Sequence, residues 1–428
     1  MACVRVVAQP VPIDTTTIDH TNSGDCKAIG DLDGDGKGDP IVGGGSLCWY
    51  ESGASFAKHI IRGQPVYNEF TTDMQAADVD GDGDIDLIIG DGNGSGNVLW
   101  FENPRLNTPA GYMSDPRAGL NWVVHVMGTH GQTVHDVEVA DMDGDGKLDV
   151  VTSGHGRTHL FRQMNASSWT DIDLTGAAGP SGGVGVSLGH ISGDALTDIA
   201  TPYGWLRNPG GSMTGTWTYF PISAATSGDE CLLVDLDGDG RLDLFTCDAH
   251  GRAATYWFQC PATPTSPSWT RRLIDSSMGS HHPEAADFNQ DGRQDILMGL
   301  ELSELSIYLN LGGLPPTFLK QQLSVTGGHN ARCGDILGNG VPDIFGCDYI
   351  GNPPVTVYIN RLVITPVCYA NCDGSTASPV LTINDFQCFL NRYARGDLSA
   401  NCDASTIAPV LNINDFQCFL NKFAGGCS

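Results

Sequence analysis

The sequence predicts an all-β fold, a seven-bladed β-propeller closed by its N-terminal strand, followed by a small α-helical domain. Three observations support this prediction. A nine-residue acidic motif recurs seven times, strands with alternating aromatic residues recur between its copies, and a second repeat of another kind begins near residue 368. We expect the propeller to span residues 1–364 and the small domain to span residues 365–428.

The acidic motif D-x-D-G-D-G-x-x-D sets the period of the propeller. Its seven copies start, in chain order, at Asp31, Asp78, Asp141, His190, Asp235, Asp287 and Asp335. The copies at His190, Asp287 and Asp335 are degenerate. Consecutive starts are 45 to 63 residues apart, which is the length of a four-stranded propeller blade.

The flanks of the motif predict four strands in each unit. Apolar stretches lie on both sides, as in VEVADMDGDGKLDVVTSG, so each copy joins a hairpin. Stretches such as LCWYES and VLWFEN predict a third strand, and FAKHII and WVVHVM predict a fourth. Only six copies of the fourth strand follow a unit. We therefore expect Cys3–Val7 to pair into the seventh blade and close the ring, with a flexible tail as the alternative.

The acidic motif also predicts calcium sites. Carboxylates at positions 1, 3, 5 and 9 of a tight loop converge, and with the carbonyl of position 7 they offer the hard oxygen ligands that Ca²⁺ prefers. The candidate ligands of the four complete loops are Asp31, Asp33, Asp35, Asp39, Asp78, Asp80, Asp82, Asp86, Asp141, Asp143, Asp145, Asp149, Asp235, Asp237, Asp239 and Asp243. The sixth loop offers Asp287, Asn289, Asp291 and Asp295. A simple Asp-Gly turn is the alternative, but four copies in register favour the metal.

The two other degenerate loops lack ligands. His190 and Ala195 interrupt the fourth loop, and Leu337 occupies a ligand position of the seventh, so we expect weak calcium binding there or none.

These loops resemble the FG-GAP (VCBS-type) repeats of integrin α-subunit propellers and of bacterial secreted proteins, over about residues 3–364. The resemblance implies the fold and calcium binding. Relatives include lectin-like, adhesive and scaffold propellers and some polysaccharide lyases, so the resemblance does not select an activity.

The C-terminal repeat has a period of 30 residues, in which an oxygen-rich loop precedes a short amphipathic helix: YANCDGSTASPVLTINDFQCFLNRYARGD, then SANCDASTIAPVLNINDFQCFLNKFAGGC. It resembles a dockerin with EF-hand-like loops, in a form found in planctomycete secreted proteins. The resemblance implies a cohesin-type partner and the calcium ligands Asn371, Asp373, Ser375, Thr382, Asp385, Asn401, Asp403, Ser405, Asn412 and Asp415. Extra residues that include Pro379 and Pro409, and Asn as first ligand, depart from the pattern. A stabilising tail or a sorting tag is the alternative.

The 14 cysteines recur with the repeats, which suits disulfides and an oxidising compartment. We predict the bridges Cys26–Cys48, Cys231–Cys247, Cys333–Cys347, Cys372–Cys388, Cys402–Cys418 and Cys368–Cys427, with Cys3 and Cys260 unassigned. No signal peptide is visible after Met1, so secretion or a cell-surface location is inferred from the cysteines and the loops. No long apolar run is present, and the net charge of −28 argues against nucleic acid and anionic membranes as partners.

A candidate ligand site follows from register. Residues three to six positions before each loop start the innermost strands, so they are expected at one mouth of the central channel. They are Asp25, Asp73, His135, Asp136, Glu138, Asp229, Glu230, His281, His282, Glu284, His329, Asn330 and Arg332, while the fourth unit offers only Val184, Gly185 and Ser187. The solvated ends of strands around a wet channel are the alternative. A site of this kind predicts that His135, His282, His329 and Arg332 share a pocket of a few hundred cubic ångströms.

Several functions suit such a ring. The first is a module that binds a glycan or an extracellular protein. The second is a polysaccharide lyase, with His135 or His282 as base and Arg332 opposite an acidic sugar. A zinc site is another alternative, held by His281, His282, Glu284 and His329. A self-assembling structural protein is the last. No nucleophile motif, phosphate-binding loop or cofactor-binding motif is present in the sequence, which argues against most other enzyme classes. Whether the protein is catalytic stays open.

Overall fold

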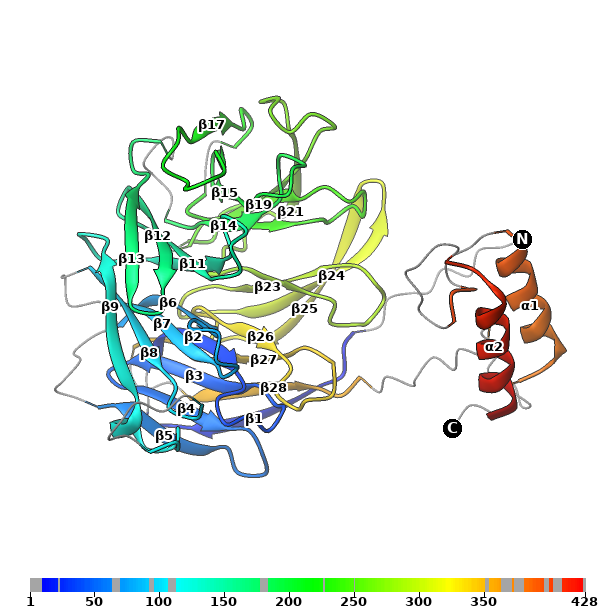
Figure 1. Cartoon of the computed structure of the whole chain (residues 1–428), viewed down its shortest axis with the longest axis horizontal. Helices are drawn as coiled ribbons and strands as arrows, with labels where there is room; N and C mark the ends of the chain where they lie inside the picture. Colours follow the sequence, from blue (N-terminus) through cyan, green and yellow to red (C-terminus); the bar gives the residue numbers. More distant parts are fainter. Residues whose placement is uncertain are drawn as a thin grey trace. The chain divides into compact units, whose positions relative to one another are not determined.

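The computed structural model describes residues 10–21, 24–63, 70–91, 96–106, 113–177, 184–225, 228–249, 251–350, 354–362, 372, 381–395, 400–402 and 410–425. The chain divides into two compact units, Met1–Leu362 and Val363–Ser428. The first unit contains seven four-stranded sheets, and every pair of neighbouring strands is antiparallel. The predicted all-β, seven-bladed propeller is confirmed, and Figure 1 shows the blades following one another through the colours.

Blades 1 to 6 each consist of four consecutive strands, which appear here in chain order. Blades 1 to 3 contain β2 (Gly24–Gly30), β3 (Asp39–Gly44), β4 (Leu47–Glu51) and β5 (Ala57–Arg62); β6 (Phe70–Ala77), β7 (Asp86–Asp91), β8 (Asn97–Glu102), the 3₁₀ turn η1 (Gly119–Asn121) and β9 (Val123–Thr129); and β10 (Asp136–Ala140), β11 (Asp149–Gly154), β12 (Arg157–Asn165) and β13 (Ser168–Asp173). Blades 4 to 6 contain β14 (Ser187–Gly189), β15 (Asp198–Thr201), β16 (Gly204–Arg207) and β17 (Thr218–Pro221); β18 (Glu230–Val234), β19 (Asp243–Cys247), β20 (Thr255–Gln259) and β21 (Thr270–Asp275); and β22 (Glu284–Ala286), β23 (Asp295–Gly299), β24 (Leu305–Gly313) and β25 (Pro316–Ser324).

Blade 7 closes the ring. It joins β26 (Arg332–Gly334), β27 (Asp343–Gly346) and β28 (Val355–Asn360) to β1 (Ile13–Asp19), which lies beside β28 in Figure 1. Closure by the N-terminal strand is therefore confirmed, but the closing strand is IDTTTID and not Cys3–Val7, which lies outside the described residues. The central residues of β1 are exposed, so polar threonines suit this outermost strand and no alternation of apolar residues marks it.

The core lies between blades, not within one sheet. In one cluster, Trp100 of blade 2 packs with Val137 and Phe161 of blade 3. The aromatic third-strand motif explains this packing, because Trp49, Trp100, Trp205 and Trp257 are all at most 2 % exposed. Each blade thus contributes a large apolar side chain to the layer that holds it against its neighbour.

The disulfides predicted within the propeller are wrong. Cys26, Cys231, Cys247, Cys333 and Cys347 are thiols, as is the unassigned Cys260. Register explains the failure. Cys231 lies opposite Thr246 and Cys247 opposite Glu230, so the two cysteines occupy neighbouring rungs and point to opposite faces of the sheet. Cys26 and Cys48 lie on β2 and β4, with β3 between them, and Cys333 lies opposite Ile344 rather than Cys347.

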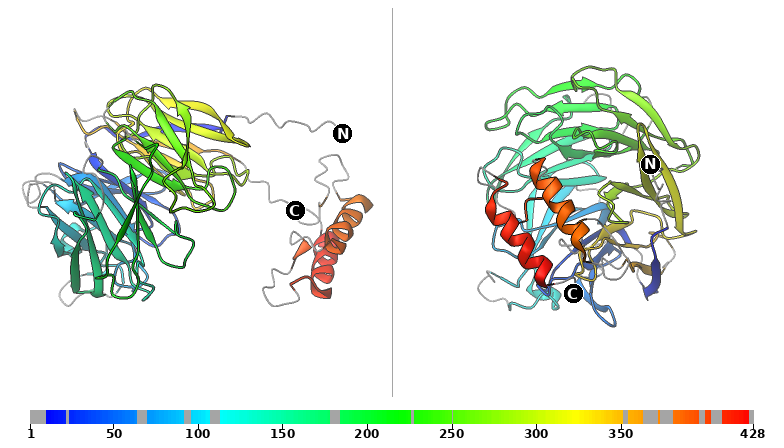
Figure 2. Two further views of the ribbon diagram at one scale, coloured as in Figure 1. Left: turned by 90° about the horizontal axis from the view of Figure 1, so that it is seen from above. Right: turned by 90° about the vertical axis from the view of Figure 1, so that its right-hand side faces the viewer.

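The C-terminal unit contains two helices, α1 (Ile383–Ala394) and α2 (Ile413–Gly425), which lie side by side in Figure 2. The rings of Phe389 and Phe419 stack with centroids 4.2 Å apart. The predicted bridges Cys372–Cys388 and Cys402–Cys418 are confirmed, each tying a loop to its helix. Neither helix is long and apolar enough to cross a membrane, among the residues that the structure describes.

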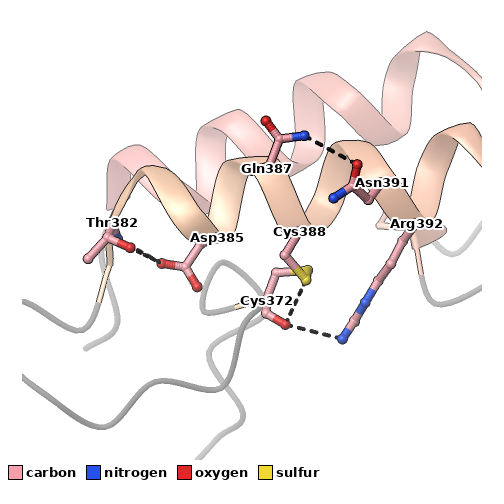
Figure 3. Close-up of a disulfide and its surroundings, with 7 residues drawn as sticks. All are labelled: Cys372, Thr382, Asp385, Gln387, Cys388, Asn391 and Arg392. Atoms are coloured by element: carbon pink, nitrogen blue, oxygen red, sulfur yellow. Dashed lines mark hydrogen bonds between the residues drawn. A yellow bond between two sulfur atoms is a disulfide. The ribbon is translucent and has the colours of Figure 1, made fainter. Parts of the chain in front are cut away.

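A capping box begins α1. The backbone N–H of Thr382 donates to Asp385 at 2.7 Å, and Asp385 is fully buried. Figure 3 shows the longer contact of the Thr382 hydroxyl with the same carboxylate, at 3.4 Å. Arg392 donates to the Cys372 carbonyl at 3.1 Å. Of the proposed ligands in this unit, Thr382, Asp385, Asn401, Asn412 and Asp415 are described, whereas Asn371, Asp373, Ser375, Asp403 and Ser405 lie outside the described residues, as do Cys368 and Cys427.

Candidate functional site

Each acidic loop connects the first strand of its blade to the second, as predicted. In the first loop, carboxylate oxygens of Asp31, Asp33 and Asp39 lie within 4.8 Å of one another. Equivalent groups form in the second and third loops, with Asp78, Asp80 and Asp82, and with Asp141, Asp143 and Asp149. Three carboxylates at this separation repel one another unless a cation or hydrogen bonds compensate them.

Backbone N–H groups organise the first aspartate of the loop. In blade 1, Asp31 accepts hydrogen bonds from the N–H groups of Gly34 at 2.7 Å, Asp35 at 3.0 Å and Gly36 at 2.9 Å. This wrap needs positive φ at both glycines, 77° and 86°, which side chains other than glycine rarely adopt. The two glycines of the sequence G-D-G therefore allow the loop to wrap around the carboxylate.

The ninth aspartate is a structural clamp in all seven loops. In blade 1, Asp39 accepts one hydrogen bond from Leu32 N–H at 3.0 Å and another from Ser52 N–H at 2.7 Å. Two equivalent bonds form in each of the other six loops, one from the second loop residue and one from a residue in the last part of the third strand or just after it. The acceptors are Asp86, Asp149, Asp198, Asp243, Asp295 and Asp343. This role explains why the ninth position stays Asp even in the degenerate loops.

The fourth loop has replaced one ligand interaction with a hydrogen bond. His190 Nδ1 lies 2.9 Å from the carbonyl oxygen of Leu196, so Nδ1 carries the proton and donates it. Leu196 is the seventh residue of this loop, whose carbonyl is the expected backbone ligand of a cation. The imidazole therefore bonds the carbonyl oxygen that a cation would use in this loop, and weak calcium binding here stays a prediction.

Side-chain amides form a series of hydrogen bonds between neighbouring blades, which was not predicted from the sequence. Asn103, just after the third strand of blade 2, donates to the Leu32 carbonyl of blade 1 at 3.0 Å. Equivalent bonds join Gln163 to Val79, Asn208 to Met142, Asn310 to Leu236 and Asn360 to Phe288. The pattern FEN, FRQ, LRN, YLN and YIN was visible in the sequence. It places an amide where it bonds the loop of the preceding blade.

The predicted channel residues lie in the first strands or just before them, and first strands of neighbouring blades contact one another, as β2 contacts β6 and β26. Three carboxylates in this ring also join blades: Asp73 accepts from Val137 N–H at 2.9 Å, Asp136 from Val186 N–H at 2.6 Å, and Glu284 from Cys333 N–H. Each acceptor lies one blade before its donor. The ring is thus part of the scaffold as well as a candidate site.

One group brings together His135, Glu230 and His281, whose ligand atoms lie within 4.8 Å of one another. His135 Nδ1 is 3.3 Å from Glu230 Oε1, and the rings of His135 and His281 stack at 5.0 Å. Burial raises the pKa of Glu230 well above its usual value and lowers that of His135. Three blades supply these residues.

A second group contains Asp73, Asp136 and His282. His282 Nδ1 is 4.0 Å from Asp136, and Asp73 forms an ion pair with Arg332. Arg332 also contacts Glu284 at 3.2 Å. These contacts divide the zinc set that the sequence suggested. Glu284 pairs with Arg332, whereas His281 and His282 belong to two different groups.

The remaining ring residues lie nearby. His329 Nε2 is 3.6 Å from Asp25 and its ring is 4.3 Å from that of His281. Burial first, and then the carboxylates of Asp136 and Glu284, raise the pKa of Glu138 well above its usual value. Asn330 lies at φ 51°, and its amide donates to the Asp25 carbonyl at 3.3 Å.

Most side chains of the ring are more buried than expected for the mouth of a channel. Asp73, Asp136, Glu230, His281, His329 and Arg332 are all at most 4 % exposed. The cavity beside Arg332 has a volume of about 150 Å³ and is lined by Gln75 and Glu284, not by the histidines. This cavity does not bring the histidines together, and the shared pocket of a few hundred cubic ångströms stays a prediction.

The comparisons with known proteins concern the repeats and the fold. The FG-GAP-like repeat model matches residues 78–152, 141–201 and 235–298, within blades 2 to 6. No curated protein matches the sequence.

Of two similar solved structures, the first supports the likeness in fold. BBS1N in complex with ARL6DN, soaked with lead, has a TM-score of 0.51 at 11 % identity and covers 82 % of this chain and 98 % of that chain. An Agrocybe aegerita lectin that recognises non-reducing terminal N-acetylglucosamine has a TM-score of 0.45 at 18 % identity, covering 71 % and 81 %. The chain therefore carries FG-GAP-like repeats, built into a seven-bladed β-propeller.

Proposed function

We propose that this protein is a secreted, calcium-stabilised propeller that binds a glycan or an extracellular protein at the mouth of its central channel. The observation that carries the proposal is the convergence of polar side chains from six of the seven blades on one ring. Bonds between blades, such as that from Val137 N–H to Asp73, hold this ring rigid. Rigid polar groups favour binding because little conformational entropy is lost when a ligand arrives.

The charge of the ring favours a neutral or cationic ligand over a polyuronate. Seven carboxyl groups belong to the ring and only one guanidinium, that of Arg332, is among them. Asp73 and Glu284 already pair with it. It therefore has little charge left to offset a uronate, so a polysaccharide lyase ranks second and a self-assembling structural protein third.

Calcium is proposed for the four complete loops and the sixth. The clustered carboxylates and the glycine turns of the first loop support this assignment, because they present several oxygens to one point. In four loops the fifth-position aspartate contacts a basic side chain two residues later, as Asp145 does with Lys147 at 2.5 Å. Exposed pairs of this kind are weak, so a divalent cation would displace them.

Secretion and anchoring are proposed from the C-terminal unit. Two disulfides in a small unit are compatible with an oxidising compartment. The duplicated loop-helix units, packed through Phe389 and Phe419, support a dockerin-like role with a cohesin-type partner. Calcium in these loops would use Asp385 and Asp415, which are fully buried.

A glycan array with the full chain in calcium buffer tests the binding proposal. Asp25→Asn is the probe variant, because the Asp25 side chain is 30 % exposed at the ring. Asp14→Asn is the matched control on the outer strand β1, where the side chain is 65 % exposed. We expect the wild type and Asp14→Asn to bind the same glycans and Asp25→Asn to bind them at least about tenfold more weakly.

A lyase assay on uronic-acid polymers, followed by the absorbance of the unsaturated product, runs in parallel. Formation of the unsaturated product would show that the protein is a lyase and not only a binding module. Equal glycan binding by Asp25→Asn and Asp14→Asn would show that the binding site is not at the channel. Assembly that depends on protein concentration, without ligand binding, would favour the structural protein.

A further inference from the structure

We propose that His135, Glu230 and His281 form a binding site for a divalent transition-metal ion of the zinc class at the centre of the propeller. This site is separate from the acidic loops and goes beyond the proposed function. Its ligands come from β18 and from the residues just before β10 and β22, so the ion would join blades 3, 5 and 6.

The geometry of the group fits such an ion. In a tetrahedral site with metal–ligand bonds of about 2.0–2.1 Å, two ligand atoms are separated by about 3.3 Å. His135 Nδ1 and Glu230 Oε1 are 3.3 Å apart, which is already this separation. All three ligand atoms lie within 4.8 Å of one another, so small side-chain rotations complete the set.

The buried carboxylate supplies an independent argument. Glu230 is 2 % exposed, and its Oε1 accepts no hydrogen bond from any residue that the structure describes. A carboxyl group in this state is costly unless a cation or a donor compensates it. The Nδ1 atom of His135 lies 3.3 Å from Glu230 Oε1. Imidazole nitrogen is a ligand type that suits transition metals.

Blade 4 makes room for the group. Gly185 precedes its first strand, and a Cβ at that position would lie 2.3 Å from Glu230 Oε2. The missing side chain lets Glu230 of blade 5 reach His135 of blade 3. The ring of His281 is fixed between those of His135, at 5.0 Å, and His329, at 4.3 Å.

The neighbouring group is a poorer candidate. Asp73 is saturated, because it accepts from the N–H groups of Met74 and Val137 and pairs with Arg332. Calcium is also a poorer fit to the proposed site than zinc, because imidazole nitrogens suit transition metals and Ca²⁺ prefers oxygen ligands. Three protein ligands would leave a fourth position for water or for a ligand atom.

The test uses the full chain with calcium in excess, so that the acidic loops are occupied, and Co²⁺ as the probe. Tetrahedral Co²⁺ absorbs visible light much more strongly than the hydrated ion. We expect one Co²⁺ per chain with this absorption, displaced by Zn²⁺. His281→Gln and Glu230→Gln should weaken binding by about 100-fold or more. The matched control His282→Gln, at the next residue, should change affinity by less than about threefold.

Circular dichroism and the unfolding midpoint in calcium establish whether each variant is folded. If Glu230→Gln does not fold, the Co²⁺ affinity of His281→Gln is the test of the site. The proposal is overturned if the wild type gives no tetrahedral band. It is also overturned if His281→Gln binds Co²⁺ like the wild type, or if only His282→Gln loses it.

Discussion

Arg332, the first residue of β26, forms an ion pair with Asp73 of β6, across a sequence separation of 259 residues. The same guanidinium contacts Glu284 of blade 6, and its Nε donates to the Lys27 carbonyl of blade 1 at 2.8 Å. One buried side chain thus links four blades at the position where the ring closes.

We expect Arg332→Gln to destabilise the propeller by about 3–5 kcal/mol, because it leaves two buried carboxylates without a cation. Arg361→Gln is the matched control: its exposed pair with Asp14, at 2.8 Å, should be worth about 1 kcal/mol or less. Denaturant unfolding in calcium measures both. Equal effects of the two variants would show that the central pair does not hold the ring.

Removal of calcium should lower the unfolding midpoint by many degrees, since several loops lose charge compensation together. Native mass spectrometry should find at least four calcium ions. Asp82→Asn, at position 5 of the second loop, should remove one ion. Asp194→Asn, at position 5 of the fourth loop, should remove none, because His190 already bonds the Leu196 carbonyl there. Two ions or fewer in the wild type would contradict the assignment.

The ninth aspartate should stabilise the fold without metal. Asp343 of the seventh loop accepts from Ile336 N–H at 3.0 Å and Asn360 N–H at 2.7 Å. Asp343→Asn turns one acceptor into a donor that faces an N–H group, at a cost of about 1–3 kcal/mol. The loss should appear in thermal unfolding with chelator present, and the exposed Asp14→Asn should lose less than Asp343→Asn, at most about 1 kcal/mol. If chelator abolishes the difference, the role of Asp343 is metal binding.

His130 should make the propeller less stable in acid. Burial lowers its pKa to about 4, and its ring is held by Thr152 and the Gly154 carbonyl at 3.0 and 3.1 Å. The unfolded state takes up a proton near pH 6.5 and the folded state only near pH 4, so stability falls between these values, by at most about 3 kcal/mol.

His130→Asn removes this titration. The variant should be less stable than the wild type at pH 7. The difference between their free energies of unfolding, called the gap below, should become smaller towards pH 4. Thermal unfolding across this range, with calcium constant, measures the gap. A gap that stays constant with pH would exclude His130 as a source of the acid sensitivity, and one that widens would mean a raised pKa. His159, whose ring lies 5.1 Å away, is also present in both proteins and cancels in the comparison.

The sequence by itself determined the blade count, the loop positions and the ring of first-strand residues, because all three follow from a local repeat. The wrap of Gly34 and Gly36 around Asp31 needs only nearby residues. Equal register in every unit then places residues such as Asp73 and Arg332 at the same end of their strands. Both C-terminal bridges were equally local, as each spans a separation of 16 residues.

Only the tertiary structure decided which residues meet. The pairing of Cys231 with Cys247 failed because a shift of one rung turns two side chains to opposite faces of a sheet, which spacing alone does not reveal. The closing strand was IDTTTID because an outermost strand need not be apolar. His281 joined His135 and Glu230 rather than His282 and Glu284 because strand direction and the space left by Gly185 select contacts between blades. Such contacts depend on how the blades pack, and no single repeat contains that information.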